Sequence, residues 1–227
     1  MGEVMVTGAT GGIGRAIVSA LAADGHQVIA IGRDAARLRS LDGVQAITAD
    51  LAGPQRLGEA IEPPARLDAL VYCAGVSLSA IAPVGGTGAA VWEETMAVNV
   101  VAAAELTRLV LPALRRSRGH VVFVNSARGV RGVPGWSAFA ASKAALQELA
   151  DSLREEEAGS GVRVTTIYPG GTATGHLRDV RAAFGGEYDA QRLIRPETLG
   201  AMVAWVLGAP PDAYVGELSV LAGPHGA

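Results

Sequence analysis

The chain has little of what a disulfide framework or a cysteine metal site requires. Its 227 residues include one cysteine, Cys73, which excludes an intrachain disulfide and a cysteine metal cluster. The stretch DALVYCAG around Cys73 is apolar and brings no cation or base close in sequence, so we expect a buried, unreactive thiol. Aromatic residues make up only 4% of the chain, whereas 49% of the residues are hydrophobic and 30 are glycine. This composition indicates a core of Ala, Val and Leu with many tight turns.

An excess of either charge is also missing. The chain has 19 basic and 22 acidic residues, which gives a net charge of −3 at pH 7. This balance provides no surface suited to nucleic acid or to an anionic membrane. No apolar run approaches the ~20 residues that a membrane-spanning helix needs, and no signal peptide precedes the first predicted strand. We therefore expect a cytoplasmic protein without nucleic-acid or membrane partners.

Short apolar runs alternate with helical stretches along the whole chain. The predicted strands cover residues 3–8, 27–32, 44–49, 69–75, 120–126, 163–170 and 217–223. The predicted helices cover residues 12–24, 34–41, 54–62, 91–117, 136–159 and 196–208. Nearly continuous apolar strands are typical of a parallel sheet that is covered on both faces. The alternation predicts a single α/β domain over residues 1–227, of the Rossmann-type, doubly wound class, with a mainly parallel seven-stranded sheet.

A glycine-rich turn, TGATGGIG, follows the first predicted strand and opens the first helix. Gly8, Gly12 and Gly14 would allow a tight turn, close approach of a pyrophosphate, and close packing of helix and strand. The free N–H groups at the helix start favour phosphate binding. An ordinary glycine-rich turn has the same pattern, but the place between a strand and a helix favours a dinucleotide site.

The end of the second predicted strand indicates which dinucleotide is bound. An acidic residue at that point binds the ribose hydroxyls of NAD, but this chain has Gly32 followed by Arg33. A guanidinium can pair with the 2′-phosphate of NADP, so we expect NADP(H) to be favoured over NAD(H). The alternative is that Arg33 is a solvated surface charge. Asp34 is expected to cap the next helix, and Asp50 either accepts a hydrogen bond from the adenine amino group or caps a helix.

Seven short elements resemble the short-chain dehydrogenase/reductase family, in order and spacing, over essentially the whole chain. They are TGATGGIG (7–14), DL (50–51), AG (74–75), Asn99 in MAVNVV, Ser126 in VNSARG, Lys143 in ASKAAL and PGGTAT (169–174). The resemblance implies a nicotinamide cofactor and redox chemistry on a small carbonyl or alcohol substrate. Together with Arg33, it predicts that the following residues contact the cofactor: Gly8, Thr10, Gly12, Ile13, Gly14, Arg33, Asp50, Leu51, Ala74, Gly75, Lys143, Pro169, Gly170, Thr172 and Thr174.

The resemblance also assigns catalytic roles. It implies that Ser126 hydrogen-bonds the substrate oxygen, that Lys143 holds the ribose hydroxyls, and that the main chain of Asn99 holds a water in a proton relay. The family places a tyrosine, its proton donor, four residues before the lysine, and this chain has Phe139 there. An alkoxide formed by hydride transfer needs a proton, and Phe139 cannot supply one. We therefore expect an impaired NADP(H)-dependent oxidoreductase, the alternative being a non-catalytic NADP(H)-binding sensor or scaffold protein.

Other residues and segments carry weaker expectations. His176, after PGGTAT, is either an exposed loop residue or, like water, a replacement for the missing acid. Residues 172–195 are expected to form a substrate loop, and Tyr168 to pack in the core. Tyr72 stands with Cys73 where the family has two asparagines, which puts the usual polar contacts of the central strands in doubt. Apolar residues on more than one face of the two longest predicted helices predict a homodimer or homotetramer.

Overall fold

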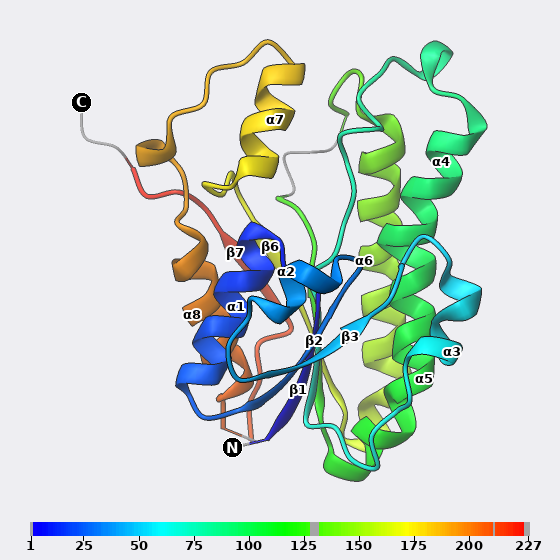
Figure 1. The fold of residues 1–227 in the computed structure, drawn as a ribbon, viewed down its shortest axis with the longest axis vertical. Helices are drawn as coiled ribbons and strands as arrows, with labels where there is room; N and C mark the ends of the chain where they lie inside the picture. The colour runs from blue at the N-terminus through cyan, green and yellow to red at the C-terminus, as the bar shows by residue number, and fades with distance from the viewer. Residues whose placement is uncertain (1, 128–131, 211, 225–227) are drawn as a thin grey trace.

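A seven-stranded sheet forms the centre of the computed structural model, which describes residues 2–127, 132–210 and 212–224 (Figure 1). The strand order is β3-β2-β1-β4-β5-β6-β7, and all neighbouring strands are parallel. The strands are β1 (Glu3–Thr7), β2 (Gln27–Gly32), β3 (Val44–Thr48), β4 (Ala69–Tyr72), β5 (His120–Val124), β6 (Arg163–Pro169) and β7 (Glu217–Val220). The prediction of a doubly wound, Rossmann-type sheet of seven strands is confirmed.

The apolar runs form strands because both faces of the sheet are covered. Val4, Met5 and Val6 in β1 are all at most 1% exposed. Successive side chains of a strand point to opposite faces, and accordingly Val4 and Val6 belong to one hydrophobic core whereas Met5 belongs to the other. A strand buried in this way needs apolar residues at every position, which is the pattern in the sequence.

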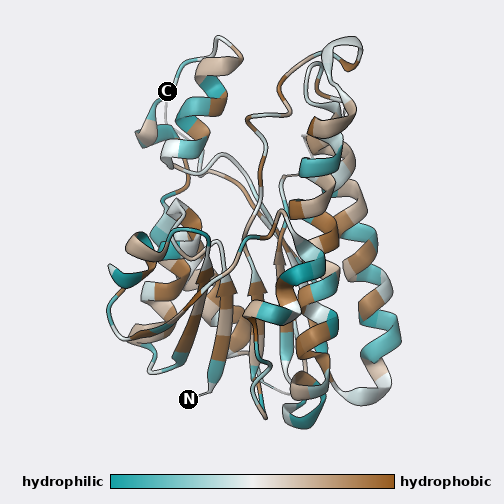
Figure 2. Ribbon diagram, turned by 45° about the vertical axis from the view of Figure 1, so that its right-hand side comes forward, coloured by the Kyte–Doolittle hydropathy of each residue, from teal (hydrophilic) through white to brown (hydrophobic). Residues whose placement is uncertain are grey.

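Helices cover the two faces of the sheet, with their apolar stripes turned inward (Figure 2). Helices α1 and α8 lie on one face, whereas α5 and α6 cover the other, with α4 packed against α6 (Figure 1). Gly200 allows the close approach of α8 to α1, because a Cβ there would lie 2.5 Å from the Ala16 carbonyl oxygen. The α-helices are α1 (Gly12–Ala23), α2 (Ala35–Arg39), α3 (Leu57–Ala60), α4 (Ala89–Met96), α5 (Ala102–Ser117), α6 (Ser137–Glu157), α7 (Gly175–Ala183) and α8 (Pro196–Leu207).

Three segments differ from the predicted elements. The helix predicted over 91–117 is divided by a π-helical turn, η3 (Ala97–Val101), into α4 and α5. The helix predicted over 54–62 is reduced to the 3₁₀ turn η1 (Pro54–Arg56) and the short α3, since Pro63 and Pro64 disfavour helical backbone just before them. The irregular segment 172–195 contains α7 and the 3₁₀ turn η6 (Ala190–Arg192).

One helical run corrects the expectation that no apolar stretch approaches membrane-spanning length. The continuous run Ala89–Ser117 has 29 residues and a mean hydropathy of 1.5 in its most apolar 18-residue window, which suffices by length and composition. Half of that window is buried inside the protein. Its residues Ala102, Ala103 and Leu106 belong to the core beneath the sheet. The apolar character of the run is therefore accounted for by packing against β4 and β5.

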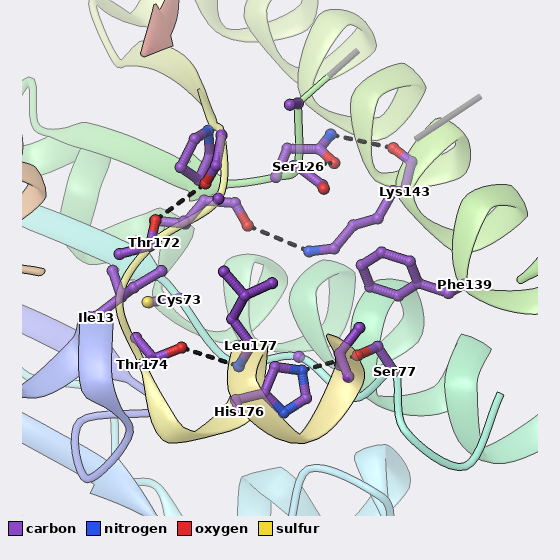
Figure 3. A pocket seen from close by; sticks show the side chains of 18 of the residues that line it. Ile13, Cys73, Ser77, Ser126, Phe139, Lys143, Thr172, Thr174, His176 and Leu177 are labelled. Carbon is purple, nitrogen blue, oxygen red and sulfur yellow. Dashed lines mark hydrogen bonds between the residues drawn. The ribbon is translucent and has the colours of Figure 1, made fainter. Parts of the chain in front are cut away.

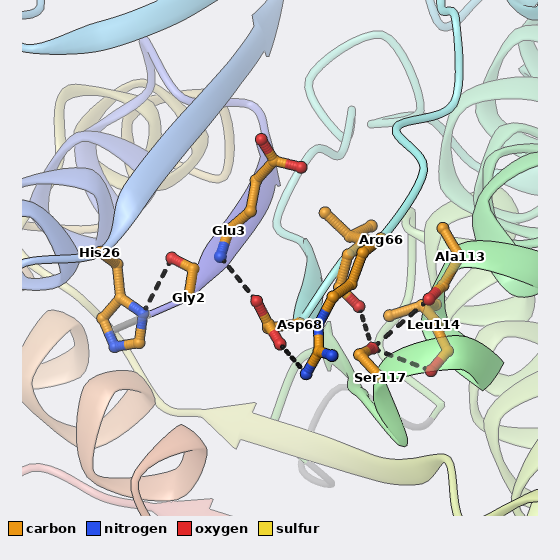
Figure 4. A network of polar contacts seen from close by, with 9 residues as sticks. Gly2, Glu3, His26, Arg66, Asp68, Ala113, Leu114 and Ser117 are labelled. Atoms are coloured by element: carbon orange, nitrogen blue, oxygen red, sulfur yellow. Dashed lines mark hydrogen bonds and ion pairs between the residues drawn. The ribbon is translucent and has the colours of Figure 1, made fainter.

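Polar contacts join the amino ends of the central strands, at the edge away from the glycine-rich turn (Figure 4). The Glu3 N–H donates to the Asp68 carboxylate at 2.9 Å, which ties the start of β1 to the residue before β4. Arg66 pairs with the other oxygen of Asp68 at 3.4 Å. The Ser117 hydroxyl at the end of α5 donates to the Leu67 carbonyl. These contacts hold together the edge of the sheet formed by the amino ends of the strands. The loops of the candidate site follow the opposite, carboxyl ends of the strands.

Candidate active site

The glycine-rich turn between β1 and α1 depends on its glycines for close approaches. Gly8 has φ +64°, and a Cβ there would lie 2.9 Å from the Ala74 Cα. A Cβ on Gly14 would lie only 2.1 Å from the Gly8 carbonyl oxygen. At Gly12 a Cβ would meet the Thr174 methyl at 2.5 Å, which brings the segment after β6 against the turn. The N-terminus of α1 has no side-chain cap, so its first N–H groups are available to an anion.

A cavity of about 270 Å³, called the Arg33 cavity below, opens beside this turn. Its lining includes seven of the residues predicted to contact the cofactor: Gly8, Thr10, Arg33, Asp50, Leu51, Ala74 and Gly75. Asp34 caps α2, as expected, by accepting from the N–H groups of Ala36 and Arg37 at 2.9 and 3.0 Å. Arg37, which the sequence analysis did not single out, also lines the cavity and donates to the Thr10 carbonyl at 2.7 Å. Two guanidinium groups therefore border the Arg33 cavity.

A second cavity of about 270 Å³, the Lys143 cavity, adjoins the first along the carboxyl ends of the strands (Figure 3). The two cavities share Cys73, Gly75 and Val76 in their linings. Besides Gly75, the predicted residues that line the Lys143 cavity are Ile13, Ser126, Phe139, Lys143, Pro169, Gly170, Thr172 and Thr174. The crevice at the strand ends is where open α/β sheets bind ligands. Along the two cavities, the fold thus brings most of the predicted site residues together from seven separate segments.

Lys143 projects from α6 toward this crevice. Its Nζ donates to the Val124 carbonyl at 3.3 Å, and burial lowers the pKa of the ammonium group to about 8. The Asn125 side chain, which the sequence analysis did not select, donates to the Lys143 carbonyl at 3.0 Å and accepts from the Ser126 N–H at 2.9 Å. Asn125 therefore links the backbone of α6 to the turn that carries Ser126.

Phe139 lies one helical turn before Lys143 and faces the same cavity, as the spacing predicts. Its ring stacks on Trp136 with a centroid distance of 4.3 Å and an interplanar angle of 26°. The Lys143 Nζ lies 5.8 Å from the centre of the Phe139 ring. This ring is a wall of the cavity, and it presents no hydrogen-bond donor to a ligand there.

Asn99 lies behind the cavity, in the π-helical turn, with no exposed surface. Its amide oxygen accepts from the Val76 N–H at 2.8 Å, and its nitrogen donates to the Val76 carbonyl and to the Ser142 hydroxyl. The side chain is thus a buried amide whose hydrogen bonds are satisfied. The expected role of Asn99, holding a water in a proton relay, therefore falls to its main chain.

The stretch YCAG, where two asparagines were expected, keeps polar contacts of its own. The Tyr72 hydroxyl donates to the Val98 carbonyl at 2.5 Å, joining β4 to the π-helical turn, and burial raises the pKa of this phenol. The Thr7 hydroxyl accepts from the N–H groups of Cys73 and Ala74, both at 3.1 Å. Cys73 is only partly buried and lines both cavities, but burial raises the pKa of its thiol to about 12, in keeping with an unreactive group.

His176 lies in the first turn of α7, a helix that the sequence analysis did not predict. Its Nε2 is 2.7 Å from the Ser77 Oγ, and both residues line the Lys143 cavity. Burial lowers the pKa of His176, and the Lys143 charge acts in the same direction against the opposing effect of Asp179. Tyr168, by contrast, is only 2% exposed, with its hydroxyl 3.1 Å from Glu217, so its expected core position is confirmed.

The parallel sheet, the glycine-rich turn after β1 and the crevice at the strand ends define a Rossmann-type α/β protein. Residues 3–184 match the family model described as short chain dehydrogenase, and the chain belongs to that family. Among curated relatives, an NADP-dependent 3-hydroxy acid dehydrogenase of Salmonella typhi is 32% identical, over 96% of this chain and 94% of its own length. An uncharacterized oxidoreductase of Myxococcus xanthus is 40% identical over 73% of this chain and 70% of its own.

Solved structures of similar proteins agree with this assignment. A short-chain dehydrogenase of Escherichia coli, complexed with NADPH, has a TM-score of 0.82 and 32% identity, covering 98% of this chain and 96% of its own. One of Shigella flexneri, complexed with NADP, has a TM-score of 0.83 and 31% identity, covering 96% of this chain and 95% of its own. The relatives are oxidoreductases, and these structural neighbours bind NADP or NADPH.

Proposed function

We propose that the chain is an NADP(H)-dependent oxidoreductase that transfers a hydride between the nicotinamide and a small carbonyl or alcohol substrate. The observation that carries this proposal is the meeting of Ser126, Lys143 and the ring of Phe139 in one cavity. That cavity adjoins another that is bordered by the glycine-rich turn and by two arginines. When bound across the two cavities, NADPH supplies the hydride.

The residues of the Arg33 cavity suit a dinucleotide that carries a 2′-phosphate. Gly8 and Gly14 keep the turn free of Cβ atoms, and the start of α1 offers uncapped N–H groups to a pyrophosphate. Arg33 and Arg37 provide the positive charge that a 2′-phosphate requires. Asp50 accepts from the adenine amino group in this proposal, while its other oxygen keeps the 3.0 Å bond from the Ala52 N–H.

Residues in and behind the Lys143 cavity bind the substrate oxygen and the nicotinamide ribose and affect proton transfer. Ser126 donates a hydrogen bond to the substrate oxygen, where negative charge develops during hydride transfer. Lys143 holds the nicotinamide ribose hydroxyls, and the main chain of Asn99 holds a water that leads to the lysine. Phe139, at the family's tyrosine position, donates no proton, so turnover is slow.

The substrate faces a partly apolar surface. Trp136 stacks on Phe139. It also packs edge to face with Phe184, with 5.5 Å between the two ring centroids, and this contact joins the start of α6 to the end of α7. The cavity also takes Leu177 and Val180 from α7 in its lining. Residues 172–195 therefore form the substrate loop in this proposal, within a single domain, and a ketone with an apolar substituent fits such a surface.

The test is Phe139→Tyr, measured as NADPH oxidation at 340 nm over a panel of ketones and diketones. Restoring a positioned acid should raise kcat by roughly 10²–10⁴-fold, whereas the Kd of NADPH should stay within about twofold because the substitution leaves the Arg33 cavity unchanged. A variant that binds NADPH yet stays inactive on every compound contradicts the proposal. A non-catalytic NADP(H)-binding sensor or scaffold protein would then be the better account.

A further inference from the structure

Ser77 and His176 are 99 residues apart in the sequence but meet at the Lys143 cavity, with Oγ and Nε2 separated by 2.7 Å. Figure 3 shows this pair on one side of the cavity and Ser126 on the other. Ser77 is only 2% exposed, whereas His176 is exposed at the start of α7. The contact therefore connects a buried hydroxyl at the cavity to a titratable ring that reaches solvent.

Both partners are held in place by contacts that leave their side-chain groups available to each other. Trp136 Nε1 donates to the Ser77 main-chain carbonyl at 3.1 Å, and the Trp136 ring stacks on Phe139. Trp136 thus contacts both Ser77 and Phe139, and all three residues line the Lys143 cavity. On the other side, the Leu177 N–H donates to the Thr174 hydroxyl at 3.1 Å, which caps the first turn of α7 beside His176.

We propose that Ser77 and His176 form a proton relay that protonates the substrate alkoxide in place of the hydroxyl that Phe139 lacks. This proposal rests on the proposed oxidoreductase function. The carbonyl carbon accepts the hydride of NADPH and the π electron pair moves to oxygen, which takes the hydroxyl proton of Ser77. The imidazolium of His176 returns a proton to Ser77 from Nε2, and solvent reprotonates the ring. The net reaction converts carbonyl, NADPH and one proton into alcohol and NADP⁺.

The charges around His176 set the pH range of this relay. On α7 itself, Asp179 favours the protonated ring, although Asp179 also pairs with Arg178 at 3.2 Å. The partial burial of the ring has the largest effect and lowers the pKa of His176, and the charge of Lys143 on α6 lowers it as well. Among the described residues that line the cavity, Cys73 is the other titratable group, and its raised pKa keeps it neutral. Relay-dependent reduction should therefore slow as pH rises through the lowered pKa of His176.

The experiment compares His176→Gln and Ser77→Ala in the native Phe139 chain and in the Phe139→Tyr chain. Ser77→Ala keeps the main-chain carbonyl that Trp136 binds, so the two replacements remove only the relay atoms. In the native chain each should lower kcat by about tenfold or more, since a less well matched acid contributes at the low end of general acid catalysis. In the Phe139→Tyr chain the loss should be under about twofold, because the phenol donates the proton directly.

Two further measurements separate a relay from a structural role. The pH profile of kcat in the native chain should fall on the alkaline side, and His176→Gln should flatten it. Histidine side-chain NMR of the cofactor-free protein should show a shifted titration midpoint for His176 in Ser77→Ala, since the two atoms are in contact. The control Glu156→Gln, an exposed residue near the end of α6, should leave kcat unchanged.

Three contrary outcomes are distinguishable: two contradict the proton relay, and one contradicts the proposed oxidoreductase function. Equal losses in both backgrounds mean that His176 and Ser77 only position the substrate, which overturns the relay. If the Phe139 chain shows no turnover while Phe139→Tyr is active, the relay is wrong and the oxidoreductase function stands. If NADPH fluorescence titration shows no cofactor binding by either chain, the proposed function itself is wrong.

Discussion

Lys143 carries its ammonium group 5.8 Å from the centre of the Phe139 ring, one turn away on the same face of α6. The two residues would form an acid and its activating cation if position 139 carried a phenol. In the native chain the cation faces an aromatic ring, which attracts it weakly and gives it nothing to activate. The lysine and the aromatic ring therefore lie where the proposed function requires them, and several consequences can be measured.

Lys143 and a tyrosine at position 139 should act as one unit. In Phe139→Tyr, the positive charge of Lys143 lowers the pKa of the phenol, so adding Lys143→Ala should remove most of the roughly 10²–10⁴-fold gain. Burial lowers the pKa of Lys143 to about 8, so the gain should also decline above about pH 8 as the ammonium loses its charge. Independent, additive losses in the double variant would show that the two side chains do not cooperate.

The preference for NADPH over NADH should depend on both arginines of the Arg33 cavity. Removing one guanidinium from a phosphate typically costs about 1.5–3 kcal/mol for a charged hydrogen bond. Arg33→Ala and Arg37→Ala should each weaken NADPH binding by about tenfold or more, with little change for NADH, which lacks the 2′-phosphate. Fluorescence titration of both cofactors measures this. If a variant keeps the native ratio of the Kd for NADPH to the Kd for NADH, the substituted arginine does not determine the cofactor preference.

Gly14 should be far more sensitive to alanine than an unhindered glycine. The added Cβ would lie 2.1 Å from the Gly8 carbonyl oxygen, so the turn must move. Overpacking of this kind typically costs about 1–3 kcal/mol, and it should also weaken cofactor binding. The matched control is Gly85→Ala, because nothing lies within 4 Å of a Cβ there. Urea unfolding and NADPH titration of the two variants test the prediction, which equal effects would contradict.

His120 should make the stability of the protein depend on pH. It is 1% exposed, its Nε2 lies 2.7 Å from the Thr165 Oγ1, and burial lowers its pKa to about 3. The unfolded chain binds this proton near pH 6.5, so the stabilisation is present above that pH and is lost as pH falls toward 3. This group contributes a slope of up to about 1.4 kcal/mol per pH unit. Urea unfolding at several pH values should show a smaller slope in His120→Asn; an identical slope would contradict the assignment.

The chain should self-associate. Helices α5 and α6 cover the sheet with one face each, and Val101, where η3 leads into α5, is 48% exposed. A homodimer or homotetramer would bury such surface through an isologous contact. Light scattering at micromolar concentration should give a multiple of the 23.1 kDa chain mass. Val101→Asp should lower the measured mass if the surface around Val101 forms the contact between copies. A monomeric mass for the native chain would contradict self-association.

Much of the fold and part of the site follow from local sequence patterns. The strands of a parallel sheet covered on both faces must be apolar at every position, so β1, β2 and β5 stand out without any knowledge of their neighbours. The glycine-rich turn is equally local, because its backbone conformation and close approaches exclude a Cβ within a few residues of chain. The four-residue spacing of Phe139 and Lys143 places them on one helical face for the same reason.

The rest depends on which distant segments pack together, and no local pattern contains that information. Thr174 and His176 are close together in the segment after β6, yet only the folded chain forms α7 there and brings His176 to Ser77. Asn125 is read as an ordinary strand-end residue until its amide is seen to hold the Lys143 backbone. Arg37 is a surface charge on a short helix until α2 docks beside the glycine-rich turn. Local sequence patterns determined the strands, most of the helices and the glycine-rich turn. Long-range packing decided the hydrogen-bond partners across loops, because its energy depends on contacts between residues far apart in the chain.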